Sequence, residues 1–479
     1  MMPGSGGHSV SGGLPRPDVQ APEPWSFPTP RVSTLSNGIR VLLHDLPGQH
    51  VIAVRVVVPI ALADEPRHLE GVAALTARLL DEGAGEHSAE EFAELLERYG
   101  VAFGAGVIEG GLSADLEVPG RLLPQALGLL SLALRAPAFP PAEVERLVAT
   151  RLAEFAQESA SPPHRAMRAV IATVYAASER ASRPTAGTPE TVGAIHRDDI
   201  AAWFRERVGP TGATVVVAGD LSAYDVEALL EDTLGGWHAP EHQAPSPLRV
   251  PERAMQAGRI VLVDRPGSVQ AEIAIAAPGP DRKVLPGWAE YPVLAYILGG
   301  SPSARIDAVL REEKGYTYGM RSMFRHRPAG GMFLVSGSVR TEVAAESLGI
   351  LLDLLDTLDS GVSEDELRSG VDYIARTAPG RYATADAVAD ESAGLALEGL
   401  PVEFPTANLR RMEALTTGDI DNAWGRTRAS DWTVVIVGDA VTLADPLRAL
   451  GCGEVDVVAV DDHDGQEPSD PGRPDPLDP

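Results

Sequence analysis

The stretch Val41-Leu-Leu-His-Asp45-Leu-Pro47-Gly48 decides the fold, because it returns later in the chain as Ile260-Val-Leu-Val-Asp264-Arg-Pro266-Gly267. A second stretch, Thr214-Val-Val-Val-Ala-Gly219-Asp220, returns as Thr433-Val-Val-Ile-Val-Gly438-Asp439. Both pairs of copies are the same number of residues apart. One short match alone is weak, but matches that recur in order at one spacing predict two homologous domains.

Each half mixes the patterns of strands and helices. Val54–Val58 and Val215–Val217 are β-branched runs that predict strands. Ser88–Tyr99 predicts a helix that opens with a capping box at Ser88 and Glu91 and closes at Gly100. Further helices are predicted at Leu122–Arg135, Ala345–Leu358 and, after a second capping box at Ser363 and Glu366, Leu367–Ile374. We therefore expect an α+β fold in which each domain is a sheet with helices packed on one face.

Composition places the domain boundaries. Residues 1–31 are rich in Pro and Gly and are expected to form a disordered tail. The N-terminal domain is predicted at 32–237, the linker at 238–256, where four prolines occur, and the C-terminal domain at 257–458. Residues 459–479 are acidic and are expected to form a second disordered tail.

The charge balance excludes several classes of partner. The chain has 40 basic and 68 acidic residues in 479, a net charge of −28, which disfavours nucleic acids and anionic membranes. Its single cysteine, Cys452, excludes an internal disulfide and a zinc knuckle. The sequence shows no signal peptide and no apolar run long enough to span a bilayer, so we expect a cytoplasmic protein.

One segment matches the inverted zinc-protease pattern H-x-x-E-H by its letters: His238-Ala-Pro-Glu241-His242. That pattern binds zinc only on a helix, where the two histidines share a face. Pro240 lies inside the segment, which also belongs to the predicted linker. We therefore interpret it as a chance match.

A second candidate stretch is Leu298-Gly-Gly-Ser-Pro-Ser-Ala-Arg-Ile-Asp-Ala-Val-Leu-Arg311-Glu-Glu-Lys-Gly315-Tyr-Thr-Tyr318-Gly319. It predicts a helix that ends at a Gly-Gly turn, a short helix from about Ser303 to Lys314, and a strand that begins at Tyr316-Thr317-Tyr318. Arg311 and Tyr318 are then expected to meet across the turn at Gly315. The alternative is that Arg311 is a solvated helix residue and Tyr318 a half-buried strand residue, and that the two glycines only cap a helix.

These motifs resemble the second domain of the insulinase-like (M16, pitrilysin) metallopeptidases, in particular the two-domain processing-peptidase branch. The resemblance extends over residues of about 33 to 455. It includes the early Ser36-Asn37-Gly38 segment, Asp64-Glu65-Pro66, the following Gly71-Val-Ala-Ala-Leu, and the duplication. It implies that the two M16-like domains form half of a clamshell, and that two such halves enclose a chamber for unstructured peptides.

The resemblance also implies a degenerate zinc helix. The family's zinc ligands fall on Ala74 and Arg78, and its catalytic Glu falls on Ala77. Alanine offers no lone pair, and a guanidinium is always protonated and repels a metal ion. A later Glu ligand would come from the helix Glu143–Glu154, but one carboxylate cannot hold zinc unaided. We therefore expect no metal in this chain, and zinc in a partner subunit with an intact H-x-x-E-H helix.

Arg311 and Tyr318 fall on the Arg/Tyr pair of the family, which implies a clamp that donates hydrogen bonds to the substrate carbonyl and its oxyanion. Arg305 and Tyr316 are interpreted as structural neighbours. The same resemblance implies that the turn formed by Gly299, Gly300 and Ser301 contacts the substrate. We expect the zinc-lacking subunit of a heterodimeric peptidase that is inactive alone. The alternative is a non-catalytic peptide-binding or assembly scaffold.

Overall fold

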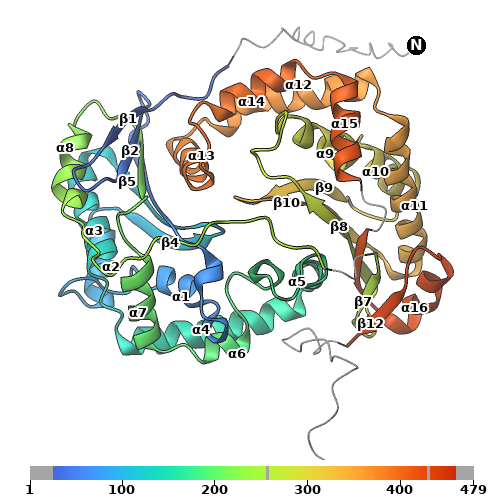
Figure 1. Cartoon of the computed structure of the whole chain (residues 1–479), viewed down its shortest axis with the longest axis horizontal. Coiled ribbons are helices and arrows are strands. Elements are labelled where there is room, and N and C mark those ends of the chain that lie inside the picture. The colour runs from blue at the N-terminus through green and yellow to red at the C-terminus, as the bar shows by residue number, and fades with distance from the viewer. Residues whose placement is uncertain (1–24, 255–257, 429–431, 460–479) are drawn as a thin grey trace, which may run out of the picture.

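The computed structural model describes residues 25–254, 258–428 and 432–459. Two six-stranded mixed sheets organise this part of the chain (Figure 1). The first has the order β1-β2-β6-β3-β5-β4, and the second has the order β12-β7-β11-β8-β10-β9. The strands of the first are β1 (Arg31–Thr34), β2 (Arg40–Asp45), β3 (Val51–Pro59), β4 (Ala102–Ile108), β5 (Gly111–Pro119) and β6 (Thr214–Gly219). Those of the second are β7 (Ile260–Asp264), β8 (Gln270–Gly279), β9 (Arg321–His326), β10 (Gly331–Arg340), β11 (Thr433–Gly438) and β12 (Val455–Val458).

The repeated stretches are neighbours inside each sheet. β2 pairs with β6 in parallel, with Val41 opposite Val215. β7 pairs with β11 in parallel, with Ile260 opposite Val434, which is the equivalent register. The duplication therefore extends to the pairing of individual residues.

The Asp residues of the repeats explain why those letters recur. Each ends a strand and accepts a hydrogen bond from the backbone of the turn beside it. Asp45 accepts from the Leu221 N–H at 3.1 Å, and its counterpart Asp264 accepts from the Ala440 N–H at 2.9 Å. Asp220 accepts from the Gly48 N–H at 3.2 Å, and its counterpart Asp439 accepts from the Gly267 N–H at 3.3 Å. The ends of the repeated strands are thus fixed by the same hydrogen bonds in both domains.

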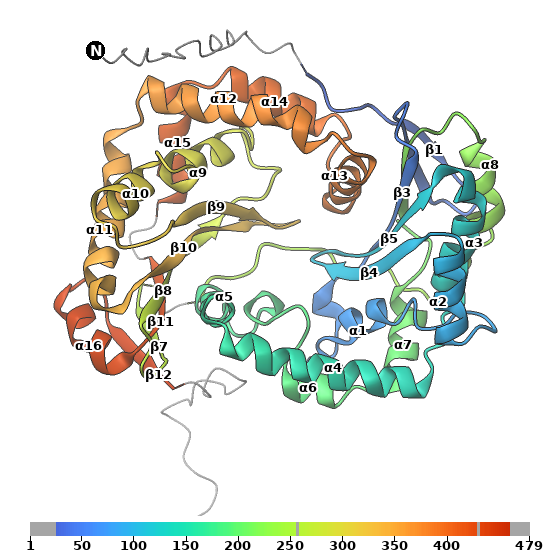
Figure 2. The same ribbon diagram turned by 180° about the vertical axis from the view of Figure 1, so that it is seen from behind.

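Helices cover the outer face of each sheet and enclose its main core (Figures 1 and 2). Those of the first half are α1 (Val72–Arg78), α2 (Ala89–Arg98), α3 (Leu123–Arg135), α4 (Pro141–Ala160), α6 (Pro189–Gly193), α7 (Arg197–Arg207), α8 (Val226–Leu230) and the π-helical turn η5 (Glu231–Gly235). Those of the second half are α9 (Glu290–Gly299), α10 (Arg305–Asp307), the π-helical turn η6 (Ala308–Glu313), α11 (Ala344–Thr357), α12 (Glu364–Arg381), α14 (Phe404–Glu413), α15 (Thr417–Thr427) and α16 (Ala440–Ala449). Short 3-10 turns lie at Leu62–Asp64, Arg67–Leu69, Gly120–Leu122, Arg180–Ser182, Thr341–Val343 and Leu358–Ser360.

The inner face of each sheet is covered by a helix from the other domain. α5 (Pro162–Val174) packs on β8 and β11, and α13 (Ala385–Glu398) packs on β3 and β6. Figures 1 and 2 show both helices between the two sheets, with α4 along one side and α12 and α14 along the opposite side. The predicted α+β class is confirmed, but the expectation of helices on one face only is wrong, since both faces are covered.

Residues 25–30 connect the two domains ahead of β1. The Trp25 ring stacks on Tyr382 with centroids 5.6 Å apart, and Phe27 is buried between Tyr382 and His44. The Phe27 N–H also donates to the Thr406 hydroxyl at 3.0 Å. Of the tail expected at 1–31, residues 1–24 lie outside the described part. The expectation is wrong for residues 25–31, because Trp25 and Phe27 pack against Tyr382 and Arg31 begins β1.

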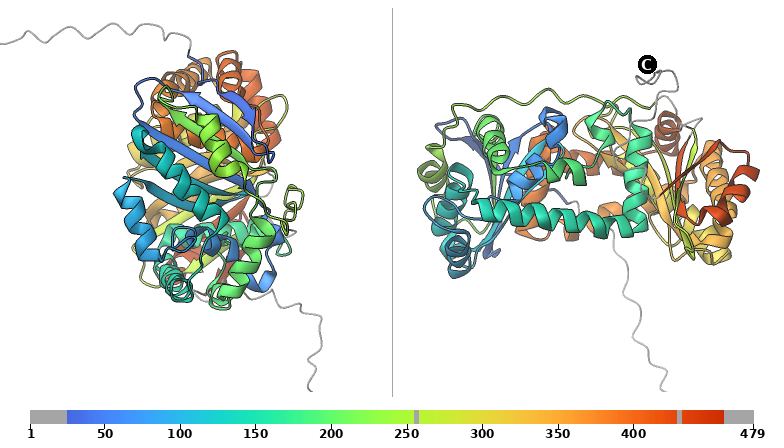
Figure 3. Two further views of the ribbon diagram at one scale, coloured as in Figure 1. Left: turned by 90° about the vertical axis from the view of Figure 1, so that its left-hand side faces the viewer. Right: turned by 90° about the horizontal axis from the view of Figure 1, so that it is seen from below.

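The linker crosses from one domain to the other, as the yellow-green segment in Figure 3 (right) shows. Residues 238–252 contain no helix or strand. The linker passes over the tips of two hairpins that meet, where Arg327 pairs with Glu109. Gly110 has a φ of +87°, and a methyl group there would lie 3.0 Å from Pro328 and 3.1 Å from Leu248, so glycine is required at this contact. Residues 460–479, most of the expected acidic tail, lie outside the described residues.

None of the described helices combines the length and the apolar character that crossing a bilayer requires.

Candidate functional site

A buried carboxylate begins α1, the helix that carries the degenerate zinc positions. Glu65 accepts hydrogen bonds from the backbone N–H groups of Gly71 and Ala73, both at 3.0 Å. Arg180 donates to its other oxygen at 2.8 Å. Burial raises the pKa of Glu65, and the Arg180 guanidinium opposes that shift. The Asp64-Glu65-Pro66 segment therefore fixes the start of α1 and the direction of its side chains.

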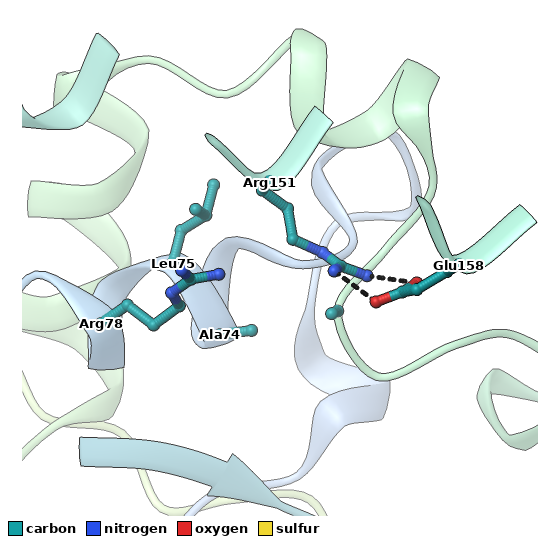
Figure 4. A pocket seen from close by; sticks show the side chains of 6 residues that line it. Ala74, Leu75, Arg78, Arg151 and Glu158 are labelled. Atoms are coloured by element: carbon teal, nitrogen blue, oxygen red, sulfur yellow. Dashed lines mark hydrogen bonds and ion pairs between the residues drawn. The ribbon is translucent and has the colours of Figure 1, made fainter. Parts of the chain in front are cut away.

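The three degenerate positions differ in their surroundings. Ala77 is buried in the core, whereas Ala74 and Arg78 line a cavity of about 160 Å³ (Figure 4). The Arg78 guanidinium donates to both carboxylate oxygens of Glu154 at 2.9 Å. Glu154 belongs to α4, the helix from which a later acidic ligand was expected. The structure thus brings a cation to that carboxylate, and the cation is a side chain.

The ion pair continues along α4. Arg151 donates to Glu154 at 3.0 Å and to Glu158 at 2.7 and 3.1 Å, and its guanidinium lies 3.8 Å from the Phe155 ring centre. The hydrogen bonds from Arg78 hold the pKa of Glu154 below its usual range. Figure 4 shows Arg151 and Glu158 side by side on the wall of the cavity. Two guanidinium groups and two carboxylates balance their charges, so we name Arg78, Arg151, Glu154 and Glu158 the paired-charge cluster.

The residues present do not fit a zinc ion. Position 74 has no donor atom, position 78 carries a fixed positive charge, and Glu154 is already occupied on both oxygens. Across residues 25–254, 258–428 and 432–459, no three His, Cys, Asp or Glu side chains are grouped closely enough to hold a metal ion. In the linker, Glu241 lies 3.5 Å from Arg205, and burial lowers the pKa of His242.

Sequence reasoning missed Arg151 and Glu158. The spacing of Arg151, Glu154 and Glu158 by three and four residues was the available signal, because such residues share one face of a helix. Nothing in the sequence links that face to Arg78, which is far away along the chain. The pairing is visible only when α1 and α4 are placed together.

Arg311 and Tyr318 lie on either side of a turn but do not contact each other through a hydrogen bond within the described residues. Arg311 is in η6, where its Nε is 3.4 Å from a Glu312 oxygen. Tyr318 is 93% exposed, so the alternative of a half-buried strand residue is wrong. The structure leaves both side chains open to a ligand.

The expected strand at Tyr316-Thr317-Tyr318 is also wrong, since β9 begins only at Arg321. Thr317 forms one isolated bridge to Val339. The Thr317 hydroxyl accepts from the Gly319 N–H at 3.0 Å, and Asp307 accepts from the Met320 N–H at 2.9 Å. These side chains take the backbone donors that a strand needs, so the segment is a turn.

The neighbours Arg305 and Tyr316 hold elements together. Arg305 donates to both oxygens of Glu366 at 2.7 and 2.9 Å, and the Tyr316 hydroxyl donates to Glu346 at 2.9 Å. Their interpretation as structural residues agrees with these contacts. Arg311 and Tyr318 have no comparable role in the described chain.

The Gly299-Gly300-Ser301 turn ends α9 in close packing. A methyl group on Gly299 would lie 2.8 Å from the Ser322 nitrogen, and one on Gly300 would lie 2.5 Å from the Tyr296 Cα. Packing therefore accounts for both glycines. The Ser301 hydroxyl is exposed, 3.2 Å from that of Ser303. A contact of this turn with substrate stays a prediction.

The duplicated domains, the exchanged inner helices and the vacated zinc helix define a two-domain clamshell half of the metallopeptidase type. Residues 40–188 match the family model described as Insulinase (Peptidase family M16), and residues 194–372 match the model Peptidase M16 inactive domain. The chain belongs to peptidase family M16, as a member that lacks the zinc site.

Relatives and solved structures agree with this assignment. An uncharacterized zinc protease of Mycobacterium tuberculosis is 25% identical over 359 residues, which covers 73% of this chain and 81% of the relative. Non-peptidase homolog YmxG of Helicobacter pylori is 22% identical over 373 residues, covering 77% and 84%. The structure of a peptidase M16 inactive domain from Pseudomonas fluorescens superimposes with a TM-score of 0.79 at 21% identity, covering 86% of this chain and 98% of that one. A protease from Helicobacter pylori gives 0.78 at 19% identity, covering 86% and 99%.

Proposed function

We propose that this chain is the zinc-lacking subunit of a two-chain M16-type peptidase. It binds an extended peptide and presents Arg311 and Tyr318 to the bond that a partner subunit hydrolyses. The partner holds zinc on an intact H-x-x-E-H helix, and this chain holds none. The observation that carries the proposal is the exposure of Tyr318, 93%, on a chain whose own zinc positions are occupied by Ala74 and Arg78.

The exposed Tyr318 ring contributes nothing to the hydrophobic core. A large aromatic side chain in water buries no apolar area and contributes little to stability. Tyr316, two residues earlier, makes the structural hydrogen bond of this turn instead. A phenol and a guanidinium that fold stability does not use are available as hydrogen-bond donors to a ligand.

The chemical role follows from those donors. In peptide hydrolysis the carbonyl oxygen gains negative charge as the tetrahedral intermediate forms. Arg311 and Tyr318 would donate hydrogen bonds to that oxygen and stabilise its charge. The nucleophile and the general base belong to the partner, because this chain has Ala77 at the position of the family's catalytic Glu.

The peptide itself would bind along a sheet edge. β4 is the edge strand of the first sheet, and methyl groups placed on Gly104 and Gly106 would meet nothing within 4 Å. The two glycines leave open space beside an unpaired strand edge, where the backbone can pair with an added strand. This would select unfolded or short peptides, since a folded substrate offers no free strand.

The first experiment is co-purification of the intact chain from the cytosol of its own host, followed by mass spectrometry of what accompanies it in equal amount. The proposal expects a companion that bears H-x-x-E-H. It also places the complex in the cytoplasm, in keeping with a single cysteine. Isolation of the chain alone from that fraction would contradict it.

The decisive test uses Arg311→Ala and Tyr318→Phe in that complex. Each is expected to lower kcat for peptide cleavage about 10²- to 10³-fold while size-exclusion chromatography shows unchanged assembly. Lys314→Gln is the matched control in the same turn, since its ion pair with Glu346 is exposed, and it should keep a near-normal rate. Unchanged turnover in both test variants would refute the clamp.

Unchanged turnover in Arg311→Ala and Tyr318→Phe would support the second candidate function, a non-catalytic peptide-binding or assembly scaffold. The match to the M16 inactive-domain model favours this candidate. The relative from Helicobacter pylori that bears the name non-peptidase homolog favours it too. In that case peptide affinity, and not cleavage, would be the measurable activity.

A further inference from the structure

A second cavity, of about 240 Å³, lies where α13 leaves the C-terminal domain to reach the other sheet. Its walls come from the segment before α9, the end of α12, the start of α14 and the end of β9, elements labelled together in Figure 2. Neither the paired-charge cluster nor Arg311 and Tyr318 contribute to this cavity. We name it the ring-lined cavity.

Three aromatic side chains from three elements form its walls: Trp288, Tyr382 and Phe404. Trp288 is held by Tyr291, with ring centroids 5.4 Å apart, and Tyr382 is held by Trp25, which stacks on it with planes 4° apart. Rings fixed by their neighbours need no reordering when a ligand enters. The cavity is therefore preformed, and its walls favour a flat apolar group.

The buried charges at the side of this cavity are already satisfied. Arg282 donates to Glu398 at 2.8 and 2.6 Å and to Glu391 at 2.9 Å. The Tyr382 hydroxyl donates to the other Glu391 oxygen at 3.3 Å. These groups shape the wall without calling for a charged ligand of their own.

Two further polar side chains belong to the lining. Arg381 is exposed, its guanidinium hydrogen-bonds to the Tyr382 side chain, and it has no carboxylate partner among the described residues. The Asn408 amide is half-buried and makes no hydrogen bond to the described residues. A guanidinium has five N–H donors, so Arg381 keeps donors beyond the one directed to Tyr382, and the Asn408 amide adds two more; N–H groups of this kind bind carboxylates.

We propose that the ring-lined cavity binds aromatic carboxylates. The ring contacts Trp288, Tyr382 and Phe404, and the carboxylate accepts hydrogen bonds from Arg381 and Asn408. A space of this size accommodates one ring with a short polar arm. The ligand is either a free aromatic acid or the C-terminal aromatic residue of a peptide, since both present the same groups. The proposal is independent of the Arg311 and Tyr318 clamp.

The test is calorimetric titration of the purified full chain with N-acetyl-L-phenylalanine. A Kd of about 0.5 mM is expected for a ligand of that size. N-acetyl-L-phenylalanine amide, which lacks the carboxylate, should bind at least about tenfold more weakly, and N-acetyl-L-alanine, which lacks the ring, should not bind measurably. Absence of saturable binding by N-acetyl-L-phenylalanine overturns the proposal.

Variants locate the site. Arg381→Gln should weaken binding about tenfold and remove the preference for the acid over the amide. Arg376→Gln, five residues earlier on α12 and paired with Asp372, is the matched control and should bind as the parent does. Phe404→Ala should abolish binding, and Asn408→Ala, at a half-buried position, gives a second readout if Phe404→Ala unfolds. If Arg381→Gln and Asn408→Ala both bind the ligand with the affinity of the parent protein, the ligand lies elsewhere and the proposal is overturned.

The source of the ligand is settled by acetyl-Ala-Ala-Ala-Phe with a free C-terminus. Tighter binding of this peptide than of N-acetyl-L-phenylalanine supports capture of peptide C-termini. Tighter binding of the small acid supports a free aromatic acid. Either result retains the site.

Discussion

At the scale of single residues, Arg78 places a guanidinium at a position where the resemblance to the family predicts a zinc ligand. It supplies a positive charge between α1 and a carboxylate of α4, Glu154, at 2.9 Å from both oxygens. A guanidinium is permanently charged and needs no uptake from solution. Glu154 therefore has a cationic partner, although no group of three metal-ligating side chains exists among the described residues.

A double-mutant cycle tests whether this pair stabilises the fold. Arg78→Ala is expected to lower the free energy of unfolding by about 1 kcal/mol, a modest value because both side chains are about one-third exposed. Glu154→Ala and the double variant should cost little more than that, so the coupling is about 1 kcal/mol. Urea unfolding measures all three.

The control for this cycle is Arg146→Ala, whose ion pairs with Glu143 and Glu82 lie at the surface. It should change the free energy of unfolding by less than about 0.5 kcal/mol. Strictly additive losses for Arg78 and Glu154 would show that the pair contributes nothing.

The loss of the zinc ligands could be predicted from the sequence, because Ala74, Ala77 and Arg78 follow directly after a recognisable helix start. The pairing of Arg78 with Glu154 could not be predicted. Glu154 was within the predicted helix, but its partner is set by how α1 crosses α4, and residue letters carry no information on that crossing. Likewise, the exposure of Tyr318 depends on Asp307 and Thr317 holding the turn.

At the scale of elements, His44 marks the contact between β2 and α13. It is fully buried, and its Nε2 lies 2.8 Å from the Ser392 hydroxyl of α13. Burial lowers the pKa of His44 to about 4 from 6.5. The imidazole is therefore neutral in the folded chain at pH 7, and the contact depends on its staying neutral.

This predicts a loss of stability in mild acid. Because the unfolded chain takes up a proton near pH 6.5 and the folded chain resists until about pH 4, stability is complete above pH 6.5 and falls between those values. The expected loss is about 3 kcal/mol. Urea unfolding of the parent and of His44→Gln between pH 7 and pH 4.5 measures the slope.

His44→Gln should remove that part of the slope, whatever its effect at pH 7. His50→Gln, on the exposed turn after β2, is the control and should leave the slope as in the parent. A variant at position 44 with the parental slope would mean that other groups cause the acid sensitivity.

Elements with local signals were predictable. The capping boxes at Ser88 and Ser363 start α2 and α12, and α3 and α11 agree with their predictions to within a residue or two. The helix expected from about 303 to 314 instead divides into α10 and the wider turn η6. A local pattern predicts that such residues are helical, but the hydrogen-bond spacing is decided by packing around them.

At the scale of the whole molecule, the exchange of α5 and α13 makes each domain depend on the other. Removing the C-terminal half would expose the inner face of the first sheet, including Leu42, Val57 and Val216. The apolar face of α5 would lose its sheet at the same time. Neither half is therefore a closed unit, although each has its own main core.

The prediction is made for two fragments split in the linker, residues 1–240 and 241–479. Expressed alone, each should aggregate or unfold, because a broad apolar face is open to water. Expressed together, they should purify as a one-to-one complex with the melting behaviour of a folded protein. A monodisperse, cooperatively melting 1–240 fragment on its own would contradict the dependence.

The duplication was predictable from the repeats, whereas the exchange was not. Runs such as Val215–Val217 were a usable signal, since a strand that is apolar at every position has both faces covered. The sequence cannot say which helix covers the second face. That depends on the path of the linker and on the meeting of the two hairpin tips at Glu109 and Arg327.

The reciprocal placement of α5 and α13 also has an evolutionary consequence. An ancestor of half this length would have had to close its inner sheet with a helix from a second copy, as a domain-swapped homodimer. Joining two such genes would turn that swap into an internal contact and would release the two copies from being identical. One half could then lose its catalytic side chains while its helix went on serving the other, so a dead active site and an intact architecture are compatible in one polypeptide.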